Sequence, residues 1–539
     1  MAQSVLLYAL IVIVSGLVLH SEIRRRKSDA HQVPAVSSAG IWQYYIGAAR
    51  YIVQAPEIIE EGCNRYPGRV FRVPRMFRWD YIVSGTTLVD ELTSAPENVI
   101  SIVEGMQEEL QADLTLDSEV FRNASRVDIV RGALTRNLNR FFPDLYDELI
   151  CACEDVFALN GTEWKLVPAL PSMKRLIARA INRIFVGLPV CRNEEYLELM
   201  MNFGIDAAIR GQVINLLPSF LQPVLGPFIS SRKQSVRRSA KYLKDLINYR
   251  IGQEEKFGRD WSGKPNDFLS WLFEVLSDEE KNVPTITAWI LITNMSALLS
   301  TTSVFTHAVF DLTANPQHIE SLREEVEKVV GELGWTREAI NKMPRIDSFL
   351  RESQRMHDNG PVTMFRKVMD PAGFEFSDGT LLPFGSMIGV ASRVEHFNPS
   401  ESKFKYYVSH RIVALMYNKF ELTTKYELAR YDDPMTFDPF RFSRKLEERA
   451  ARGDDEGEHF TEYMISTSPE HLAFGHKQHA CPGRFFVAAE LKTLLAHLVM
   501  HYDLRAETEG VRPPDFAFGL AVLPSLSGNI FLRKRIAYE

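Results

Sequence analysis

The chain has 539 residues, of which 45% are hydrophobic and 24% are charged, and its formal net charge is −7. This composition excludes a disordered chain, which has fewer apolar residues and a larger net charge, and the 30 glycines and 27 prolines follow no collagen-like repeat. The mildly acidic balance gives no general affinity for nucleic acid, whose phosphates favour clustered lysine and arginine. We therefore expect a globular protein without a nucleic-acid partner.

The N-terminus predicts a membrane anchor. Residues 1–19 carry no charge, Val5 to Leu19 is almost wholly apolar, and a basic cluster follows at 24–27. Such a run just spans a bilayer, and positive charge after the run argues against a cleavable signal peptide. The positive-inside rule places the remaining chain in the cytosol. We expect an anchor at 1–23, a basic stop and linker at 24–50, and a catalytic domain at 51–539; the alternative for the first segment is an ordinary core helix.

The next part of the chain predicts two short strands and then mostly helix. Val70 to Gly85 has the composition of two strands joined by a basic turn. Residues 86–160, 172–212 and 230–257 carry helical periodicity. No internal repeat or low-complexity segment interrupts this pattern, so we expect one mainly helical domain.

Two later segments are also apolar, but neither has the pattern of a membrane span. Pro284 and Pro316 bracket a long uncharged helix, but its hydroxyl groups, Asn294 and His307 suit a buried central helix beside a polar cavity. The segment 213–229 is apolar but holds three prolines, which no continuous helix tolerates. Two interpretations stay open for it: a segment that dips into a membrane surface, and a buried loop.

Five cysteines are too few and too irregularly spaced for a disulfide framework, which favours a reducing compartment. Cys151 and Cys153 lie closer together than zinc-knuckle ligands, and we interpret them as helix residues. Cys481 differs because it just precedes a helix, whose N-terminal dipole and free amides stabilise a thiolate that can bind metal. A zinc site would recruit the nearby histidines, but the spacing matches no common zinc pattern, and a lone cysteine is otherwise a small buried hydrophobe. These histidines are His471, His476 and His479.

The segment around Cys481 resembles the signature of the cytochrome P-450 haem-thiolate monooxygenases. That signature reads Phe, two residues, Gly, one residue, Arg or His, one residue, Cys, one residue, Gly, and Phe474, His479, Cys481 and Gly483 match it. Lys477 replaces the glycine, which in the family permits a tight backbone bend. The resemblance implies that Cys481 is the axial ligand of a haem iron.

A second signature is Glu352-Ser-Gln-Arg355, in which the three-residue spacing places both charged side chains on one face of a helix. Its partner, Arg441, stands in the later sequence Phe437-Asp-Pro-Phe-Arg441. By resemblance, Glu352, Arg355 and Arg441 form a buried salt-bridge network that stabilises the haem-binding core.

The third signature lies in the long helix, at Ala297-Leu-Leu-Ser300-Thr301-Thr302. The family pattern is a small residue, Gly, any residue, an acid, Thr, and Thr or Ser, with the acid and the alcohol relaying protons. Thr301 fits the alcohol, with Ser300 and Thr302 beside it as further catalytic candidates. Because Ser300 replaces the acid, we expect proton delivery through hydroxyls and water or from elsewhere.

The resemblance covers nearly the whole chain and implies a mainly α fold with small β-sheets, the cytochrome P-450 fold, plus one N-terminal transmembrane helix. It implies haem b (iron protoporphyrin IX) as cofactor and O2 as co-substrate. The cofactor would be held by Cys481, by Arg366 and His479 at its propionates, and by Phe474, Gly483 and Arg131. No dinucleotide motif follows any strand, so electrons would come from a separate NADPH-cytochrome P-450 reductase in the endoplasmic reticulum membrane.

The expected activity is oxidation of a lipophilic small molecule. VDIVRGALTRNL and FLRESQRM are similar to sequences of ascomycete secondary-metabolism enzymes such as ent-kaurene oxidases, which favours a terpenoid or meroterpenoid substrate. Two alternatives stay open. Ser300 suggests a hydroperoxide or endoperoxide isomerase with the same haem-thiolate centre, and Lys477 together with a surplus segment suggests an inactive haem or lipid binder from a mis-spliced gene.

The surplus segment is 403–427, in a connection that is longer than in the family. It lacks turn residues, and Val408-Ser409 is what a GTAAGT splice donor encodes. We hypothesise a retained intron, and the alternative is a true surface insertion.

Overall fold

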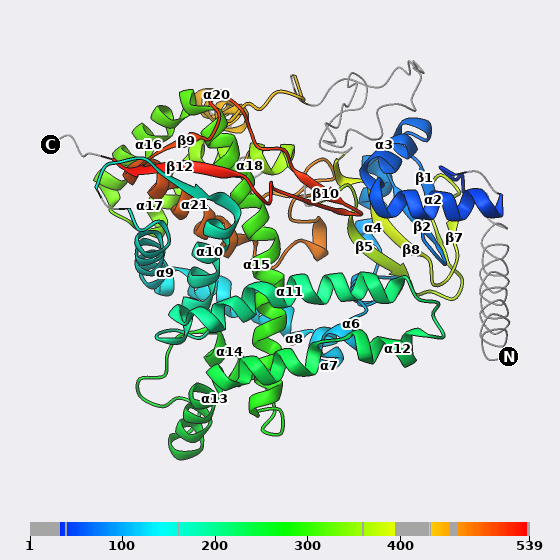
Figure 1. Ribbon diagram of the computed structural model, residues 1–539, viewed down its shortest axis with the longest axis horizontal. Coiled ribbons are helices and arrows are strands. Elements are labelled where there is room, and N and C mark those ends of the chain that lie inside the picture. The colour runs from blue at the N-terminus through cyan, green and yellow to red at the C-terminus, as the bar shows by residue number, and fades with distance from the viewer. Residues whose placement is uncertain are drawn as a thin grey trace, which may run out of the picture.

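A computed structural model describes residues 33–37, 40–159, 161–357, 360–393, 431, 433–452 and 462–535. These residues form a mainly helical body with small β-sheets (Figure 1), as the sequence predicts. The predicted anchor at 1–23 and the surplus segment at 403–427 lie outside the described residues.

The described helices of the first half are α2 (Ile41–Val53), α3 (Ala55–Arg65), α4 (Thr86–Ser94), α5 (Ile102–Leu110), α6 (Ala112–Thr115), α7 (Ser118–Arg122), α8 (Ser125–Ile129), the π-helical turn η1 (Val130–Leu134), α9 (Thr135–Phe157), α10 (Ala169–Phe185), η2 (Val190–Arg192), α11 (Glu194–Asn215), α12 (Gln222–Ile229), α13 (Arg232–Phe257) and α14 (Phe268–Val275). Those of the second half are α15 (Val283–Ala314), η3 (Pro316–His318), α16 (Ile319–Leu333), α17 (Arg337–Asn341), α18 (Pro344–Met356), α20 (Arg441–Arg452), η5 (Lys477–His479) and α21 (Arg484–His501). The strands are β1 (Val70–Pro74), β2 (Trp79–Val83), β3 (Ile100–Ser101), β4 (Lys165–Pro168), β5 (Thr363–Val368), β6 (Phe374–Glu375), β7 (Leu381–Leu382), β8 (Met387–Val390), β9 (Tyr502–Ala506), β10 (Phe516–Phe518), β11 (Ala521–Leu523) and β12 (Asn529–Lys534).

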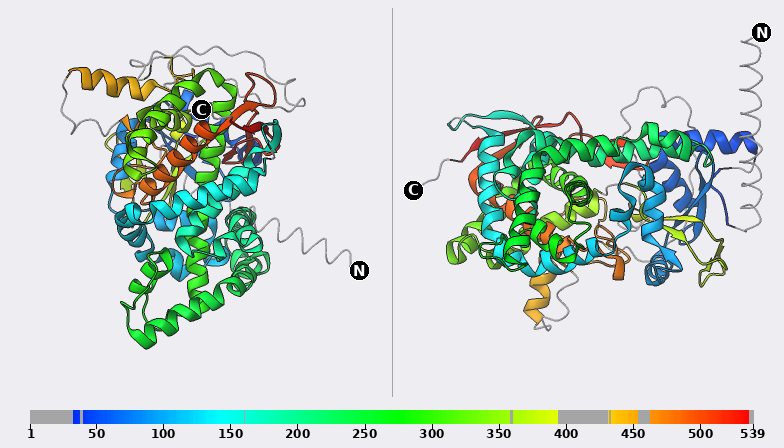
Figure 2. Two further views of the ribbon diagram at one scale, coloured as in Figure 1. Left: turned by 90° about the vertical axis from the view of Figure 1, so that its left-hand side faces the viewer. Right: turned by 90° about the horizontal axis from the view of Figure 1, so that it is seen from below.

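The larger sheet has the strand order β1-β2-β8-β5-β3 and lies beside α2 and α3, to one side of the helical body (Figures 1 and 2). The predicted strand pair within Val70 to Gly85 is confirmed, because β1 and β2 pair in antiparallel register from Val70 opposite Val83. A second sheet has the strand order β4-β12-β9, so the C-terminal strand β12 pairs with β4 on one side and β9 on the other. The two hairpins β6–β7 and β10–β11 complete the described strands.

Helix α15 runs through the centre of the helical body (Figure 1) and packs against α10, α11, α13 and α18. The Asn282 side chain accepts a hydrogen bond from the Thr285 amide, Pro284 occupies the first turn, and Asn315 ends the helix. Among the described residues it is the one helix long and apolar enough to cross a membrane, but 56% of its most apolar window is buried in the protein. This burial supports the interpretation of α15 as a core helix.

Two sequence expectations need correction. The linker predicted at 24–50 is helical from Ile41 onward, because Tyr44, Ala48 and Tyr51 recur at helical spacing and are buried on one face of α2. The buried-loop interpretation of 213–229 is wrong. Helix α11 ends at Asn215, α12 follows, and the side chain of Phe228 is 86% exposed.

Candidate active site

The segment that carries Cys481 is a tight turn between η5 and the N-terminus of α21. The Cys481 amide donates a hydrogen bond to the Phe474 carbonyl at 2.7 Å, so the cysteine is joined directly to the first residue of the predicted signature. Phe474 packs against the main hydrophobic core. A Cβ atom on Gly483 would lie 4.0 Å from the Cys481 Sγ and 3.5 Å from the Val130 side chain, so η1 borders the cysteine.

Two opposing effects act on the Cys481 thiol. Burial is the larger effect and raises its pKa, while hydrogen bonds from the Gly483 and Arg484 amides and the charge of Arg484 lower it. The amides of the helix N-terminus therefore point at sulfur, as the sequence predicts. Without a bound metal ion, burial outweighs the amides and the charge of Arg484 and favours the neutral thiol. A bound metal ion would favour the thiolate.

Lys477 occupies the position of the missing signature glycine. Its φ of 54° lies in the left-handed region, so lysine adopts here the backbone conformation that glycine adopts without strain. The Lys477 Nζ lies 2.7 Å from the Asp90 carboxylate and also contacts Ser94, which anchors it to α4. The bend is therefore formed in spite of the substitution.

The structure brings Glu352, Arg355 and Arg441 together. Arg355 donates from Nε and Nη2 to the two Glu352 oxygens, each at 2.8 Å, and Arg441 Nε lies 3.2 Å from Glu352 Oε1. Glu352 and Arg355 are fully buried. Arg355 also donates to the Pro434 carbonyl and Arg441 to the Thr436 carbonyl, so the cluster joins α18 to the segment that precedes α20.

Arg366 and His479 lie together, and the Glu97 carboxylate lies 3.7 Å from the His479 Nε2. Arg366 is 1% exposed, its Nη1 donates to the Met364 carbonyl, and its Nη2 has no hydrogen-bond partner among the described residues. Burial lowers the pKa of Arg366 to about 10. The pKa of His479 is also lowered, first by burial and then by Arg366, and Arg131 donates to the Gln478 carbonyl nearby. A buried guanidinium such as that of Arg366 favours an acidic ligand.

On α15, Ser300 is exposed while Thr301 and Thr302 are buried. Between Ile286 and Thr313, a stretch described without gaps, Ser296 and Ser300 are the two exposed residues, and they lie one turn apart on one face. The Oγ1 atom of Thr302 is buried without a hydrogen-bond partner among the described residues. The predicted catalytic alcohols therefore lie beside the single open face of a buried helix.

The zinc alternative for Cys481 finds no support. None of His471, His476 and His479 joins Cys481 in a cluster of ligating groups within the described part of the chain. The cluster that does form there consists of His307, His357 and Asp515.

Sequence reasoning missed that cluster because its members come from three distant segments. Arg512 already occupies it: its guanidinium donates to Asp311, Asp515 and His307 at 2.9, 2.7 and 2.6 Å. Because the Arg512 guanidinium already supplies positive charge to this cluster, no metal ion is needed there. Arg126, which reaches Ser296, was also missed, since no motif marks it.

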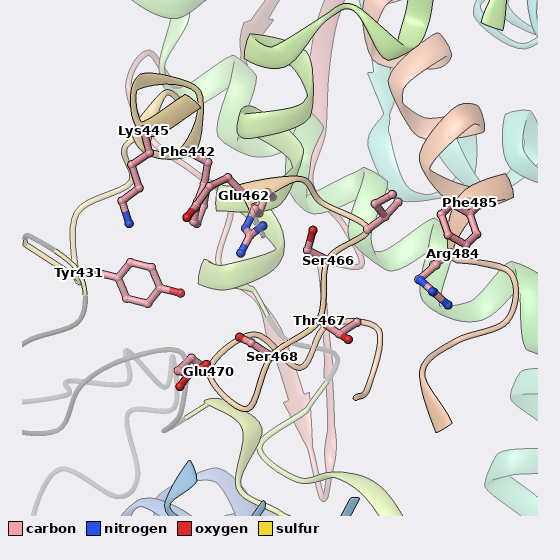
Figure 3. A pocket seen from close by; sticks show the side chains of 12 residues that line it. Tyr431, Phe442, Lys445, Glu462, Ser466, Thr467, Ser468, Glu470, Arg484 and Phe485 are labelled. Carbon is pink, nitrogen blue, oxygen red and sulfur yellow. The ribbon is translucent and has the colours of Figure 1, made fainter. Parts of the chain in front are cut away.

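A pocket of about 670 Å³ lies at the start of α21, which begins three residues after Cys481 (Figure 3). It is lined by Arg484 and Phe485 at the start of α21, and by Tyr431, Lys445 and Glu470 across from them (Figure 3). Its charged lining differs from the apolar lining that a lipophilic substrate prefers. We therefore do not assign this pocket to the substrate.

A cysteine held beneath helix amides, a buried arginine with a histidine beside it, and a central helix with one open hydroxyl-bearing face together point to a haem-thiolate protein. The family model of cytochrome P450 matches residues 130–401 and 423–530. The chain belongs to the cytochrome P450 family. As a member of this monooxygenase family it is an oxidoreductase, and the family and fold imply haem b as its cofactor.

Individual relatives agree with this assignment. The chain is 34% identical over 537 residues to "Cytochrome P450 monooxygenase 103" of Postia placenta, covering 99% of each chain. It is 32% identical to "Cytochrome P450 monooxygenase CYP512U6" of Ganoderma lucidum, over 90% of this chain and 88% of the relative. Among solved structures, the retinoic acid-bound cyanobacterial CYP120A1 superposes with a TM-score of 0.64 at 17% identity, covering 93% of this chain and 99% of the other, which shows the shared fold.

Proposed function

We propose that this protein is a membrane-bound monooxygenase that oxidises a lipophilic secondary metabolite, with a terpenoid or meroterpenoid favoured. The observation that carries the proposal is the Cys481 turn, in which two backbone amides point at a half-buried sulfur, with the buried guanidinium of Arg366 and the ring of His479 nearby. The terpenoid class rests on the similarity of VDIVRGALTRNL and FLRESQRM to fungal secondary-metabolism enzymes.

The residues present fit a haem. Cys481 would bind the iron, and Arg366 and His479, with their unsatisfied nitrogens, would pair with its propionates. When bound, haem supplies O2 activation, and electron density from the thiolate favours O–O cleavage. In the chain itself, α15 buries Thr301 and Thr302, and the hydroxyl groups of this helix would pass protons toward the reaction site.

Electrons would come from an NADPH-cytochrome P450 reductase. The charged pocket beside Arg484 supports docking on this face, because Arg484 Nη1 donates to the Cys481 carbonyl and the pocket is therefore close to the thiolate. Its lining carries three cations, Arg351, Lys445 and Arg484, against two acids, Glu462 and Glu470, and this positive excess suits an acidic partner surface.

Membrane attachment would combine the anchor predicted at 1–23 with exposed apolar side chains of the domain, which would place the catalytic body on the cytosolic face of the endoplasmic reticulum. Val224 and Phe228 of α12 are 60% and 86% exposed, and Trp42 of α2 is 80% exposed. Both helices lie toward the same end of the molecule (Figure 1). Apolar patches of this kind are typical of interfaces with protein or membrane.

We further propose that 403–427 is not part of the working fold. The family match stops at 401 and resumes at 423, which supports an insertion or a retained intron. Sequencing spliced message tests this, and a main transcript that retains the stretch would exclude the intron.

A reduced carbon monoxide difference spectrum tests the haem-thiolate assignment. The purified protein should show the red-shifted thiolate band, and Cys481→Ser should abolish it while the protein stays folded by circular dichroism. Absence of the band in the wild-type protein would overturn the assignment. Substrate class is then tested by screening terpenoid, steroid and polyketide scaffolds with reductase and NADPH.

Ser300 favours one alternative, a hydroperoxide or endoperoxide isomerase, because such a reaction needs no external electrons and no acid for proton relay. Turnover without NADPH and reductase would support the isomerase. Strict dependence on both would support the monooxygenase.

A further inference from the structure

Arg126, on α8, is a half-buried guanidinium without an acidic partner. Its Nη1 lies 3.3 Å from the Ser296 Oγ, its Nη2 lies 3.4 Å from the Phe121 carbonyl, and its Cζ lies 5.2 Å from the Phe121 ring centre. Among the described residues, its Nε is buried without a hydrogen-bond partner and no carboxylate forms an ion pair with it. Burial lowers the pKa of Arg126, and no neighbouring charge opposes this effect.

The position of Arg126 places this charge beside the site. Ser296, its hydrogen-bond partner, is one of the two exposed residues in the buried core of α15, one turn from Ser300. Helix α8 continues directly into η1, where Val130 borders Gly483 and Cys481. Arg126 therefore lies where the open face of α15 and the cysteine segment approach each other.

The acidic groups of a haem would have other partners. Arg366 and His479 lie together on β5 and η5, and the charges that act on His479 are those of Arg366, Glu97 and Arg131. Arg126 is not among them. A half-buried guanidinium that is neither paired among the described residues nor coupled to the propionate region is costly unless a ligand neutralises it.

We propose that Arg126 binds a carboxylate on the substrate, while Ser296, whose Oγ accepts from Arg126 Nη1, holds the guanidinium at the open face of α15. The inference rests on the proposed function and narrows the substrate class to lipophilic acids. A guanidinium presents parallel N–H groups that match a carboxylate, and the pair is strong where water is excluded. A neutral ester or alcohol of the same skeleton would leave the charge of Arg126 uncompensated. The protein would therefore bind the acid in preference to the ester or alcohol.

The test uses ligands that bind whatever the natural substrate is. In a series of ω-imidazolyl alkanoic acids of increasing chain length and their methyl esters, the imidazole binds haem iron and shifts the Soret band. The length of the alkyl chain then sets how far the carboxylate reaches from the imidazole. Dissociation constants are measured for the holoprotein and for Arg126→Gln and Arg126→Lys. Arg122→Gln is the matched control, because Arg122 is four residues earlier and is 38% exposed in ion pairs with Glu104 and Asp113.

At the chain length that reaches Arg126, the wild type and Arg122→Gln should bind the acid about tenfold or more tightly than the ester. Arg126→Gln should lose this preference and Arg126→Lys should keep part of it. Equal preference in wild type and Arg126→Gln at every length would overturn the proposal. Failure of every imidazole to shift the Soret band would instead contradict the haem-thiolate assignment itself.

A second measurement separates substrate carboxylate from haem propionate. Haem transfer to apomyoglobin is followed for Arg126→Gln and for Arg366→Gln. Haem loss from Arg126→Gln at the wild-type rate supports a substrate role. Loss as fast as from Arg366→Gln would assign Arg126 to a propionate and overturn the substrate assignment.

Discussion

Arg355 Nη2 donates to Glu352 Oε1 at 2.8 Å, and both side chains are completely buried. The Asp438 amide donates to the same oxygen at 3.0 Å, so this one carboxylate compensates two arginines and orients the backbone before α20. A buried charge in this position is costly to leave alone. The cluster therefore acts as a unit, in which the loss of one member leaves the others unpaired.

Glu352→Gln should destabilise the protein by about 3–5 kcal/mol, because Arg355 and Arg441 would remain charged in a buried site. Urea unfolding followed by circular dichroism measures the change. Glu338→Gln is the control, since Glu338 pairs with Lys342 and the two side chains are 66% and 59% exposed. That exposed pair should contribute less than about 1 kcal/mol. A similar small loss for Glu352→Gln would contradict the assigned role of the cluster.

The sequence and the fold agree where local patterns decide the structure. Pro284 and Asn315 mark the first turn and the end of α15, and the basic turn between β1 and β2 marks that hairpin. Glu352 and Arg441 are far apart in the sequence, so local periodicity does not predict their contact. The family motifs did predict it. The start of α2 was missed because its polar neighbours resemble a linker, while its buried face depends on packing against β1.

Tertiary contacts without motifs were not predictable. Arg512 meets His307 and Asp311 only because the loop before β10 folds back onto α15. Arg126 is unpaired only because no acid from another described element approaches it. The role of such a charge depends on its neighbours in the folded protein, and a single residue in the sequence does not reveal those neighbours.

Position 477 should show a reversal of the usual preference between glycine and alanine. Lys477→Gly and Lys477→Ala both lose the contact with Asp90, but alanine keeps the strain of a positive φ. Lys477→Ala should therefore be less stable than Lys477→Gly by about 1 kcal/mol. At Gln478, whose φ is not positive, alanine should be the more stable substitution. Thermal unfolding of the four variants provides the comparison, and the same order at both positions would refute the role of the positive φ.

Thr301 and Thr302 provide a matched pair for proton delivery, since both are buried and adjacent on α15. If Thr301 relays protons, Thr301→Ala should lower the product formed per NADPH consumed by about tenfold, less than a direct proton donor contributes because water still supplies protons. Thr302→Ala should have a smaller effect. The measurement is the ratio of product and hydrogen peroxide to NADPH. Equal coupling in both variants would remove Thr301 from the relay.

The cluster around His307 should make stability depend on pH. Burial, the charge of His357 and that of Arg512 hold the pKa of His307 well below its usual value of 6.5, and Arg512 donates to its Nδ1. The unfolded chain therefore binds a proton that the folded protein does not. Stability is complete above pH 6.5 and falls on acidification, by at most about 1.4 kcal/mol per pH unit for this group.

The carboxylates of the cluster affect stability at lower pH than His307 does. The pKa values of Asp311 and Asp515 are lowered chiefly by His357 and Arg512, against the effect of burial, so their contribution is lost only below their unfolded value of 3.8. Between about pH 6.5 and 5, His307→Gln should therefore show a shallower loss of stability than the wild type, while being less stable at about pH 7.5. Urea unfolding at each pH measures the slope. An unchanged slope in His307→Gln would show that other histidines, such as His497 with its pKa lowered to about 3 by burial, account for the acid sensitivity.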